Sequence, residues 1–222
     1  MTAGSSPDRG EPELDANGRA AAPRFVVGVG ASAGGLEALE TLLQAMPADT
    51  GLAFVVVQHL SPDHKSHMLE LLGRHTTMPV EVATDGLLLA ADRVYLIPPG
   101  KLLSLRAGAL CLTERPGGLN LPIDVFFTSL AEDLGDRAIG VVLSGTGSDG
   151  ARGARAIKAA GGRVFAQDPS TAKFDGMPRA VIAAGLVDRV LPIAAMAAAL
   201  ARHPAATADA ASAVARADDG AP

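Results

Sequence analysis

The sequence predicts a doubly wound α/β domain, with a mostly parallel sheet, helices on both faces and a small antiparallel hairpin at one edge. Several segments are apolar throughout rather than alternating, which is typical of strands covered on both faces. They are interleaved with stretches of helical spacing, such as Leu36, Leu39 and Leu43. This order implies parallel strands joined by right-handed crossovers.

The elements follow from these two patterns in chain order. The predicted strands are residues 25–30, 52–57, 93–97, 102–105, 109–112, 138–143, 163–166 and 187–190. The predicted helices are residues 34–46, 65–75, 123–134 and 151–160, and two more that begin at Pro178 and Pro192. The pair 102–105 and 109–112 predicts the hairpin, which turns at Ala107-Gly108.

The chain has 222 residues, of which 48% are hydrophobic, enough for one domain of this class and too few for two. We expect that domain at residues 24–203. Residues 1–23 are rich in Gly, Pro and charged side chains and predict a disordered tail. Residues 204–222 are rich in Ala and predict a flexible C-terminal tail.

The composition limits which binding partners and which cellular compartment are expected. A net charge of -5 and 3% aromatic residues disfavour nucleic acid as a partner, which needs clustered Lys and Arg or stacking surfaces. The sequence has neither a long uncharged apolar run nor a signal peptide, so no membrane insertion is expected. Cys111 is the only cysteine, which fits a reducing compartment and predicts a cytoplasmic protein.

Three residue types of hydrolytic chemistry follow predicted strands. Ser32 comes after the strand at 25–30, His59 after the strand at 52–57, and Asp149 closes the loop after the strand at 138–143. Ligands of such sheets gather outside the carboxyl ends of the strands. We therefore expect the three side chains at one edge of the sheet.

Ser32 lies in Gly30-Ala31-Ser32-Ala33-Gly34, a G-x-S-x-G pattern between a strand and a helix. In that context the serine is held at the tip of a sharp turn and can act as a nucleophile, beside backbone N–H groups that can receive an oxyanion. Ser32 as a simple helix cap is an equally good interpretation of this motif alone.

The same glycines also suggest a phosphate-binding turn of a dinucleotide domain. That interpretation requires an acidic residue at the end of the second strand, where this chain has Gln58 and His59 and no acid until Asp63. The spacing also departs from G-x-G-x-x-G. No cofactor is predicted.

His59 is the predicted general base, because imidazole has a suitable pKa and the residue ends the strand beside that of Ser32. His64 and His67 have no third ligand at a sensible spacing, so no metal site is predicted. Asp149 is the predicted acid that orients the imidazole, with capping of the next helix as the alternative. Thr146, in the same Gly-rich loop, offers a backbone N–H toward the oxyanion.

These residues resemble the catalytic domain of chemotaxis protein-glutamate methylesterases. The segments that carry the resemblance are Gly30 to Gly35, Val57-Gln58-His59, Leu143 to Ala151, Ala166-Gln167-Asp168 with Gly176-Met177-Pro178-Arg179, and Ile123-Asp124-Val125-Phe126-Phe127. The similarity spans roughly residues 25–200 with the motifs in the family's order.

The resemblance implies a serine carboxyl-ester hydrolase that acts on γ-glutamyl methyl esters of chemoreceptors or similar signalling proteins, and on glutamines at the same positions. Ser32, His59 and Asp149 match its triad. The residues expected to form the oxyanion site and substrate pocket are Ala33, Thr146, Gly147 and Met177. The family usually has Thr at position 33 and Met at position 146, and the two variants resemble methylesterase domains fused to receptor methyltransferases.

Typical members carry an N-terminal receiver domain, for which about 23 residues leave no room. We therefore expect a freely active enzyme, one controlled by a separate regulatory partner, or a piece of a larger regulatory protein. The alternative to an enzyme is a methylesterase-like regulatory or binding domain that has kept the fold without turnover.

Overall fold

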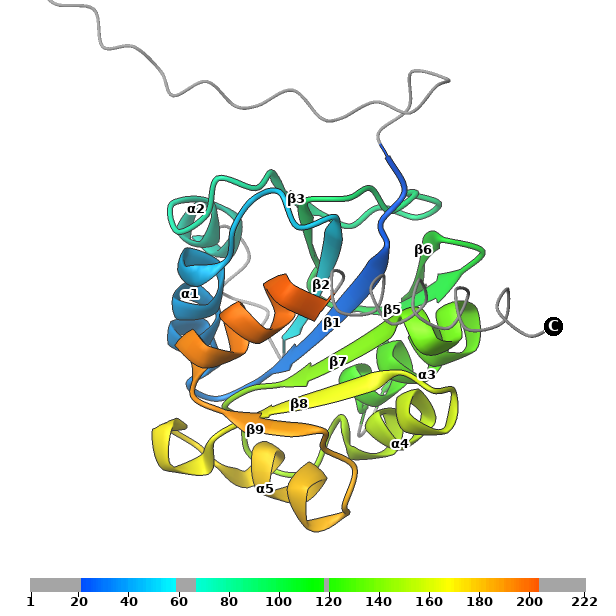
Figure 1. The fold of residues 1–222 in the computed structure, drawn as a ribbon. Coiled ribbons are helices and arrows are strands. Elements are labelled where there is room, and N and C mark those ends of the chain that lie inside the picture. The colour runs from blue at the N-terminus through cyan, green and yellow to red at the C-terminus, as the bar shows by residue number, and fades with distance from the viewer. Residues whose placement is uncertain (1–20, 59–66, 118–119, 204–222) are drawn as a thin grey trace, which may run out of the picture.

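The computed structural model describes residues 21–58, 67–117 and 120–203. Seven strands form one sheet, in the order β3-β4-β2-β1-β7-β8-β9, and every neighbouring pair is parallel (Figure 1). The strands are β1 (Phe25–Ala31), β2 (Leu52–Gln58), β3 (Val80–Val82), β4 (Arg93–Leu96), β7 (Ala138–Val142), β8 (Arg163–Gln167) and β9 (Arg189–Leu191). The predicted doubly wound parallel sheet is confirmed.

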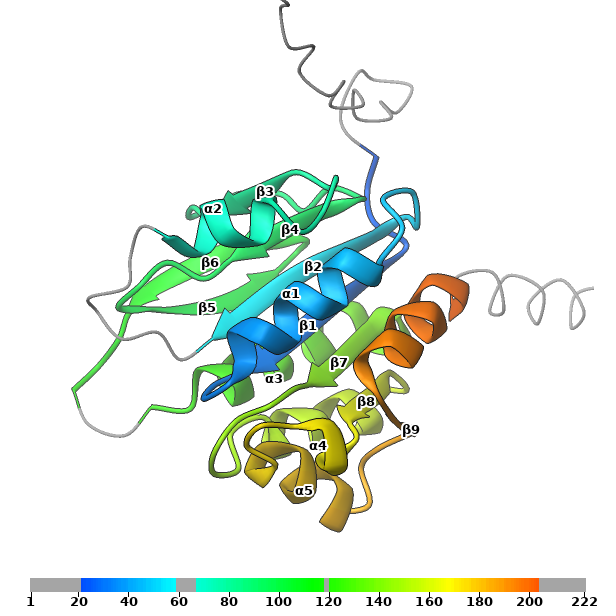
Figure 2. The same ribbon diagram turned by 90° about the vertical axis from the view of Figure 1, so that its left-hand side faces the viewer.

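Helices cover both faces of this sheet (Figure 2). One face carries α3 (Pro122–Leu134), α4 (Ala151–Ala159) and α5 (Gly176–Ala183). The other carries α1 (Gly35–Ala45), α2 (His67–Gly73) and a helix over residues 193–203. Short 3₁₀ turns occur at Gly135–Arg137 and Pro169–Thr171. None of the helices in these described ranges is long and apolar enough to span a membrane.

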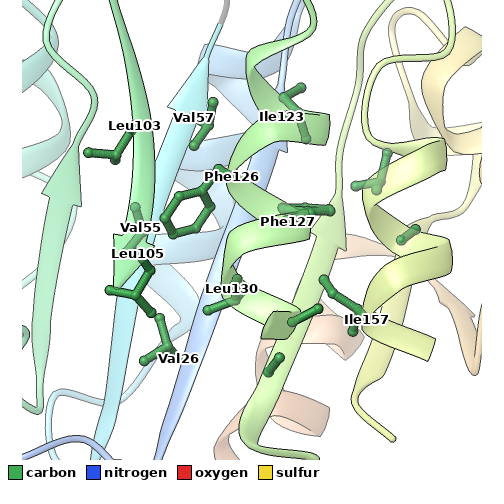
Figure 3. Packing of buried hydrophobic residues seen from close by; sticks show 14 of the residues in the cluster. Val26, Val55, Val57, Leu103, Leu105, Ile123, Phe126, Phe127, Leu130 and Ile157 are labelled. Carbon is green, nitrogen blue, oxygen red and sulfur yellow. The ribbon is translucent and has the colours of Figure 1, made fainter. Parts of the chain in front are cut away.

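The central strands are buried on both sides, as their continuous apolar runs predicted. Along β1, Val26 points into the cluster under α3, whereas Val27 and Val29 point into the cluster under α1, and all three are at most 2% exposed. Figure 3 shows Phe126 and Phe127 of α3 packed over the sheet. Burial of large side chains on two faces is the main stabilising contribution to such a sheet.

The predicted hairpin is present as β5 (Lys101–Arg106) and β6 (Ala109–Glu114). Ala107 and Gly108 form its turn with φ of 50° and 73°, the left-handed pair that two-residue hairpins require. The hairpin makes a separate two-stranded sheet that is not hydrogen-bonded to the main one. It lies against α3, where the Leu105 N–H donates to Ser129 Oγ (3.0 Å).

Several elements differ from their predicted bounds by one or two residues, and one strand was not predicted. The strand β3 was not predicted, because three residues are too few to show a periodicity. Helix α5 begins at Gly176 rather than Pro178, since a proline in the first helical turn lacks only an N–H that has no partner there. The division of the chain into tail, domain and tail stays a prediction.

Candidate active site

The candidate site lies where the sheet changes direction. The next strand in the chain, β2, lies on one side of β1, and β7 lies on the other side. The connections that leave the carboxyl ends of β1 and β7 therefore run in opposite directions. Such a switch point opens a crevice at the carboxyl edge of the sheet. Ser32 follows β1, and Ser144 to Asp149 follow β7. Two bonds join the strand ends: Leu143 N–H to the Gly30 carbonyl (2.9 Å) and Ser32 N–H to the Ser144 carbonyl (3.0 Å).

Ser32 occupies a tight turn between β1 and α1 and is partly exposed. Gly34 is the N-cap of α1, with φ of +70°, and as a glycine it has no side chain that could cap the helix. The Gly35 N–H donates to the Ser32 carbonyl (2.8 Å), which closes the turn. Ser32 therefore lies two residues before the N-cap of α1 and is not itself that cap.

Met177, a predicted pocket residue, is fully buried beside Ser32. A Cβ at Gly145 would overlap Met177 Sδ and would lie 2.9 Å from Ser32 Cβ. The backbone at Gly145 and Met177 is also joined by a hydrogen bond from Met177 N–H to the Gly145 carbonyl (2.9 Å). Glycine at position 145 is thus required by the close approach of the Ser32 turn and α5.

Ser144 connects three segments of the site, a role that the sequence reasoning missed. It is 1% exposed, and its Oγ donates to the Ala33 carbonyl (2.9 Å) and accepts from Phe174 N–H (3.0 Å). Its own N–H donates to Gln167 Oε1 (2.9 Å), and Gln167 Nε2 donates to the Thr171 carbonyl (3.0 Å). The signal in the sequence was the pair of motif segments that contain Ser144 and Gln167.

Asp149 is 3% exposed and directly precedes Gly150, the N-cap of α4, but its carboxylate lies at the N-terminus of α3. Its carboxylate accepts the N–H groups of Ile123 (3.1 Å) and Asp124 (2.9 Å). The capping interpretation thus holds for a different helix from the one expected. A carboxylate has about four acceptor positions, so it can accept more hydrogen bonds than these two backbone N–H groups supply.

Asp124 makes the reciprocal contact, from α3 to the start of α4. It is 2% exposed, and its Oδ1 accepts the N–H groups of Gly150 (3.0 Å) and Gly153 (2.8 Å) at the start of α4. Asp149 therefore caps α3, the helix that contains Asp124, and Asp124 caps α4, the helix that follows Asp149. Burial raises the pKa of Asp124, as does the charge of Asp149, while the Gly153 N–H and the Arg152 guanidinium, 3.7 Å away, act in the opposite direction.

Thr146 and Gly147 lie at the open side of the crevice, where both are exposed and Gly147 has φ of +80°. Together with residues 172–176 they line an open cavity of about 450 Å³. Ala33 follows Ser32 in the turn. Three of the four predicted pocket residues therefore border Ser32 or this cavity, and Met177 is buried against Gly145.

His59, the predicted base, lies outside the described residues. The last residue before it, Gln58, is the register partner of Ala31 in the parallel pair of β2 and β1. The strand ends that precede His59 and Ser32 are therefore neighbours in the sheet.

The glycines of the first strand serve packing. A Cβ at Gly28 would lie 2.9 Å from Phe127, and one at Gly30 would overlap Ile123. Side chains of α3 thus fill the space beside these glycines, which explains Gly28 and Gly30 without a phosphate ligand. Among the described residues, no three His, Cys, Asp or Glu side chains are grouped so that they could hold a metal ion.

Comparison with known proteins decides the family. The model of the CheB methylesterase family matches residues 27–200. The chain belongs to this family. The crystal structure of the Thermotoga maritima CheB methylesterase catalytic domain superposes with a TM-score of 0.75 at 30% identity, covering 80% of this chain and 97% of that one. The predicted resemblance and fold are thereby confirmed.

Relatives of known name point the same way. A protein-glutamate methylesterase/protein-glutamine glutaminase of Burkholderia lata is 40% identical over 199 residues, which is 86% of this chain and 53% of the relative. One of Anaeromyxobacter dehalogenans is 40% identical over 76% of this chain and 50% of its own length. This chain spans about half of each. Their names are those of hydrolases, the enzyme class predicted from the sequence.

A third relative is much longer. An uncharacterized 104.1 kDa protein of Rhodobacter capsulatus is 54% identical over 127 residues, 57% of this chain but only 13% of the relative. A segment similar to this chain can therefore form a small part of a much longer protein.

Proposed function

We propose that the protein is a protein-glutamate methylesterase that hydrolyses γ-glutamyl methyl esters on chemoreceptors, in the cytoplasm, during adaptation of a chemotaxis-type signal. The observation that carries the proposal is Ser32, partly exposed on the strand-to-helix turn at the switch point of a CheB-family fold. Ser32 would be the nucleophile, His59 the general base and Asp149 the residue that orients it.

The chemistry follows the serine hydrolase scheme. Ser32 Oγ attacks the ester carbonyl carbon while its proton passes to the His59 imidazole. The tetrahedral intermediate collapses, and methanol leaves with the proton that the imidazolium returns. Water, deprotonated by the same imidazole, then cleaves the acyl-serine ester and releases the free glutamate side chain. No cofactor is needed for this sequence.

Charge on the carbonyl oxygen has to be stabilised during both attacks. The backbone N–H groups of Ala33 and Thr146 are the proposed donors. Ala33 follows the nucleophile, and Thr146 follows Gly145, where an added Cβ would lie 2.9 Å from Ser32 Cβ. A backbone donor does not depend on side-chain identity. The Ala33 and Thr146 variants are therefore compatible with activity.

Asp149 suits an orienting role because its carboxylate is buried and fixed by two backbone donors. A fixed carboxylate holds an imidazole in one tautomer and stabilises its charged form. The same acyl-enzyme can form from a glutamine side chain with loss of ammonia. The names of the relatives from B. lata and A. dehalogenans include this second activity.

The deciding experiment is methanol release from a methylated chemoreceptor fragment by the native protein and by Ser32→Ala. We expect the variant to lose about three decades of rate or more. Ser104→Ala, in the separate hairpin sheet, is the matched control and should keep full activity. Equal release by native protein and Ser32→Ala would reject the nucleophile. A folded native protein without any release would instead favour the non-catalytic binding domain.

A further inference from the structure

Phe174 is an exposed aromatic side chain next to the candidate nucleophile. Four of the six phenylalanines, Phe54, Phe126, Phe127 and Phe165, are at most 4% exposed, whereas Phe174 is 41% exposed. A single exposed apolar side chain is common on protein surfaces, so exposure alone carries no meaning. Its position and its rigidity distinguish this one.

The backbone at Phe174 is fixed by the site itself. Its N–H donates to Ser144 Oγ (3.0 Å), and its carbonyl accepts the Gly145 N–H (2.9 Å). Ser144 is buried and is held in turn by Gln167. The loop therefore presents the aromatic ring from a rigid support rather than from a mobile segment.

The ring lies at the rim of the crevice. A Cβ at Gly34, two residues after Ser32, would lie 3.1 Å from Phe174 Cδ2. On its other side Phe174 lines the open cavity of about 450 Å³ that Thr146 and Gly147 border. An extended or helical segment that delivers an ester to Ser32 would pass over this ring.

We propose that Phe174 determines specificity by contacting apolar side chains that flank the esterified glutamate on the substrate protein. This inference rests on the proposed function. A methyl ester is small and neutral and offers little area, so affinity must come from neighbouring residues. A rigid aromatic side chain supplies such area at a small cost in conformational entropy and is enriched at the centres of interfaces.

The test compares two substrates, a methylated chemoreceptor fragment and p-nitrophenyl acetate. Phe174→Ala should lower kcat/KM for the protein substrate about tenfold, mainly through KM, because it removes binding area and leaves the chemistry intact. Hydrolysis of the small ester should stay within about twofold of native. Phe174→Gln should match Ala, and Phe174→Leu should recover most of the loss. These two variants keep a side chain of substantial size and cover the case in which Ala disturbs folding.

Leu88→Ala is the matched control, because Leu88 is 60% exposed and lines a different cavity together with Pro23 and Val26 at the start of β1. Leu88→Ala should leave kcat/KM unchanged for both substrates. Equal losses on both substrates would overturn the inference and make Phe174 a support of the catalytic groups. So would an unchanged KM for the protein substrate. A native protein that cleaves the small ester but releases no methanol would reject the proposed function itself.

Discussion

Aspartates at both edges of the sheet accept backbone N–H groups, but those at the carboxyl edge are buried more deeply. At the carboxyl edge, Asp124 and Asp149 accept backbone N–H groups while at most 3% exposed. At the amino edge, Asp92 and Asp188 also accept backbone N–H groups, but both are only partly buried. Burying a carboxylate costs free energy even when its hydrogen bonds are made.

The buried polar groups are therefore concentrated rather than scattered. Among the described residues, four buried polar side chains, Asp124, Ser144, Asp149 and Gln167, lie near the carboxyl edge. The exception is the hydroxyl of the buried Tyr95, which accepts the Ala90 N–H (2.8 Å). This difference supports the proposed site at the carboxyl edge, and it can be tested by comparing variants at the two edges.

The largest difference is expected between Asp149→Asn and Asp92→Asn. An amide at position 149 can no longer orient and stabilise an imidazolium, so kcat should fall by roughly three to four decades. Asp92 has φ of 58° and accepts the Thr50 and Gly51 N–H groups (2.8 Å each), and Asn tolerates that backbone.

Asp92→Asn should therefore keep kcat on the methylated chemoreceptor fragment. Melting temperatures of both variants show whether the folded state is retained. A similar kcat in the two would mean that Asp149 only caps α3 and plays no part in orienting a base.

Much of this comparison could be predicted from the sequence, and part of it could not. The strands were predictable because Phe54 to Val57 are apolar on both faces, and the strand ends put Ser32 and Asp149 at one edge. The reciprocal caps were not, because Asp124 and Gly150 are 26 residues apart and their bond depends on how α3 and α4 pack. Periodicity reports the burial of one element and says nothing about polar contacts between two.

The same limit applies to Phe174 and Ser144. Helical or strand spacing is absent in residues 172–175, so nothing in the sequence distinguished a fixed, exposed ring from an ordinary loop residue. Ser144 could be placed after a strand, but its contacts to Ala33 and Phe174 join three loops. Contacts of this kind need the tertiary structure.

A second difference is expected between two glycines. Gly145→Ala would place a Cβ against Met177 and Ser32, which should destabilise the fold by about 1–3 kcal/mol and displace the nucleophile. Gly73→Ala adds its methyl group in open space at the end of α2 and should be neutral or slightly stabilising. Urea unfolding measures both.

The collision at Gly145 can also be relieved. In a double-mutant cycle, Met177→Ala should recover part of the stability lost in Gly145→Ala, because the two groups share one space. Strictly additive losses would show that the backbone at 145 matters for another reason.

The smallest effect concerns the pH dependence of stability, where Asp124 and Asp188 should show opposite slopes. Burial and the neighbouring Asp149 raise the pKa of Asp124. Burial also opposes ionisation of Asp188, but the Lys158 side chain, the Val164 N–H and Arg163 outweigh it and lower its pKa.

The signs follow from linkage. The native protein should lose stability relative to Asp124→Asn as pH rises through the raised pKa of Asp124. It should lose stability relative to Asp188→Asn as pH falls through the lowered pKa of Asp188. Urea unfolding of the three proteins at several pH values between about 3 and 7 measures both differences. Parallel slopes would mean that burial at the carboxyl edge does not set its carboxylates apart from those at the amino edge.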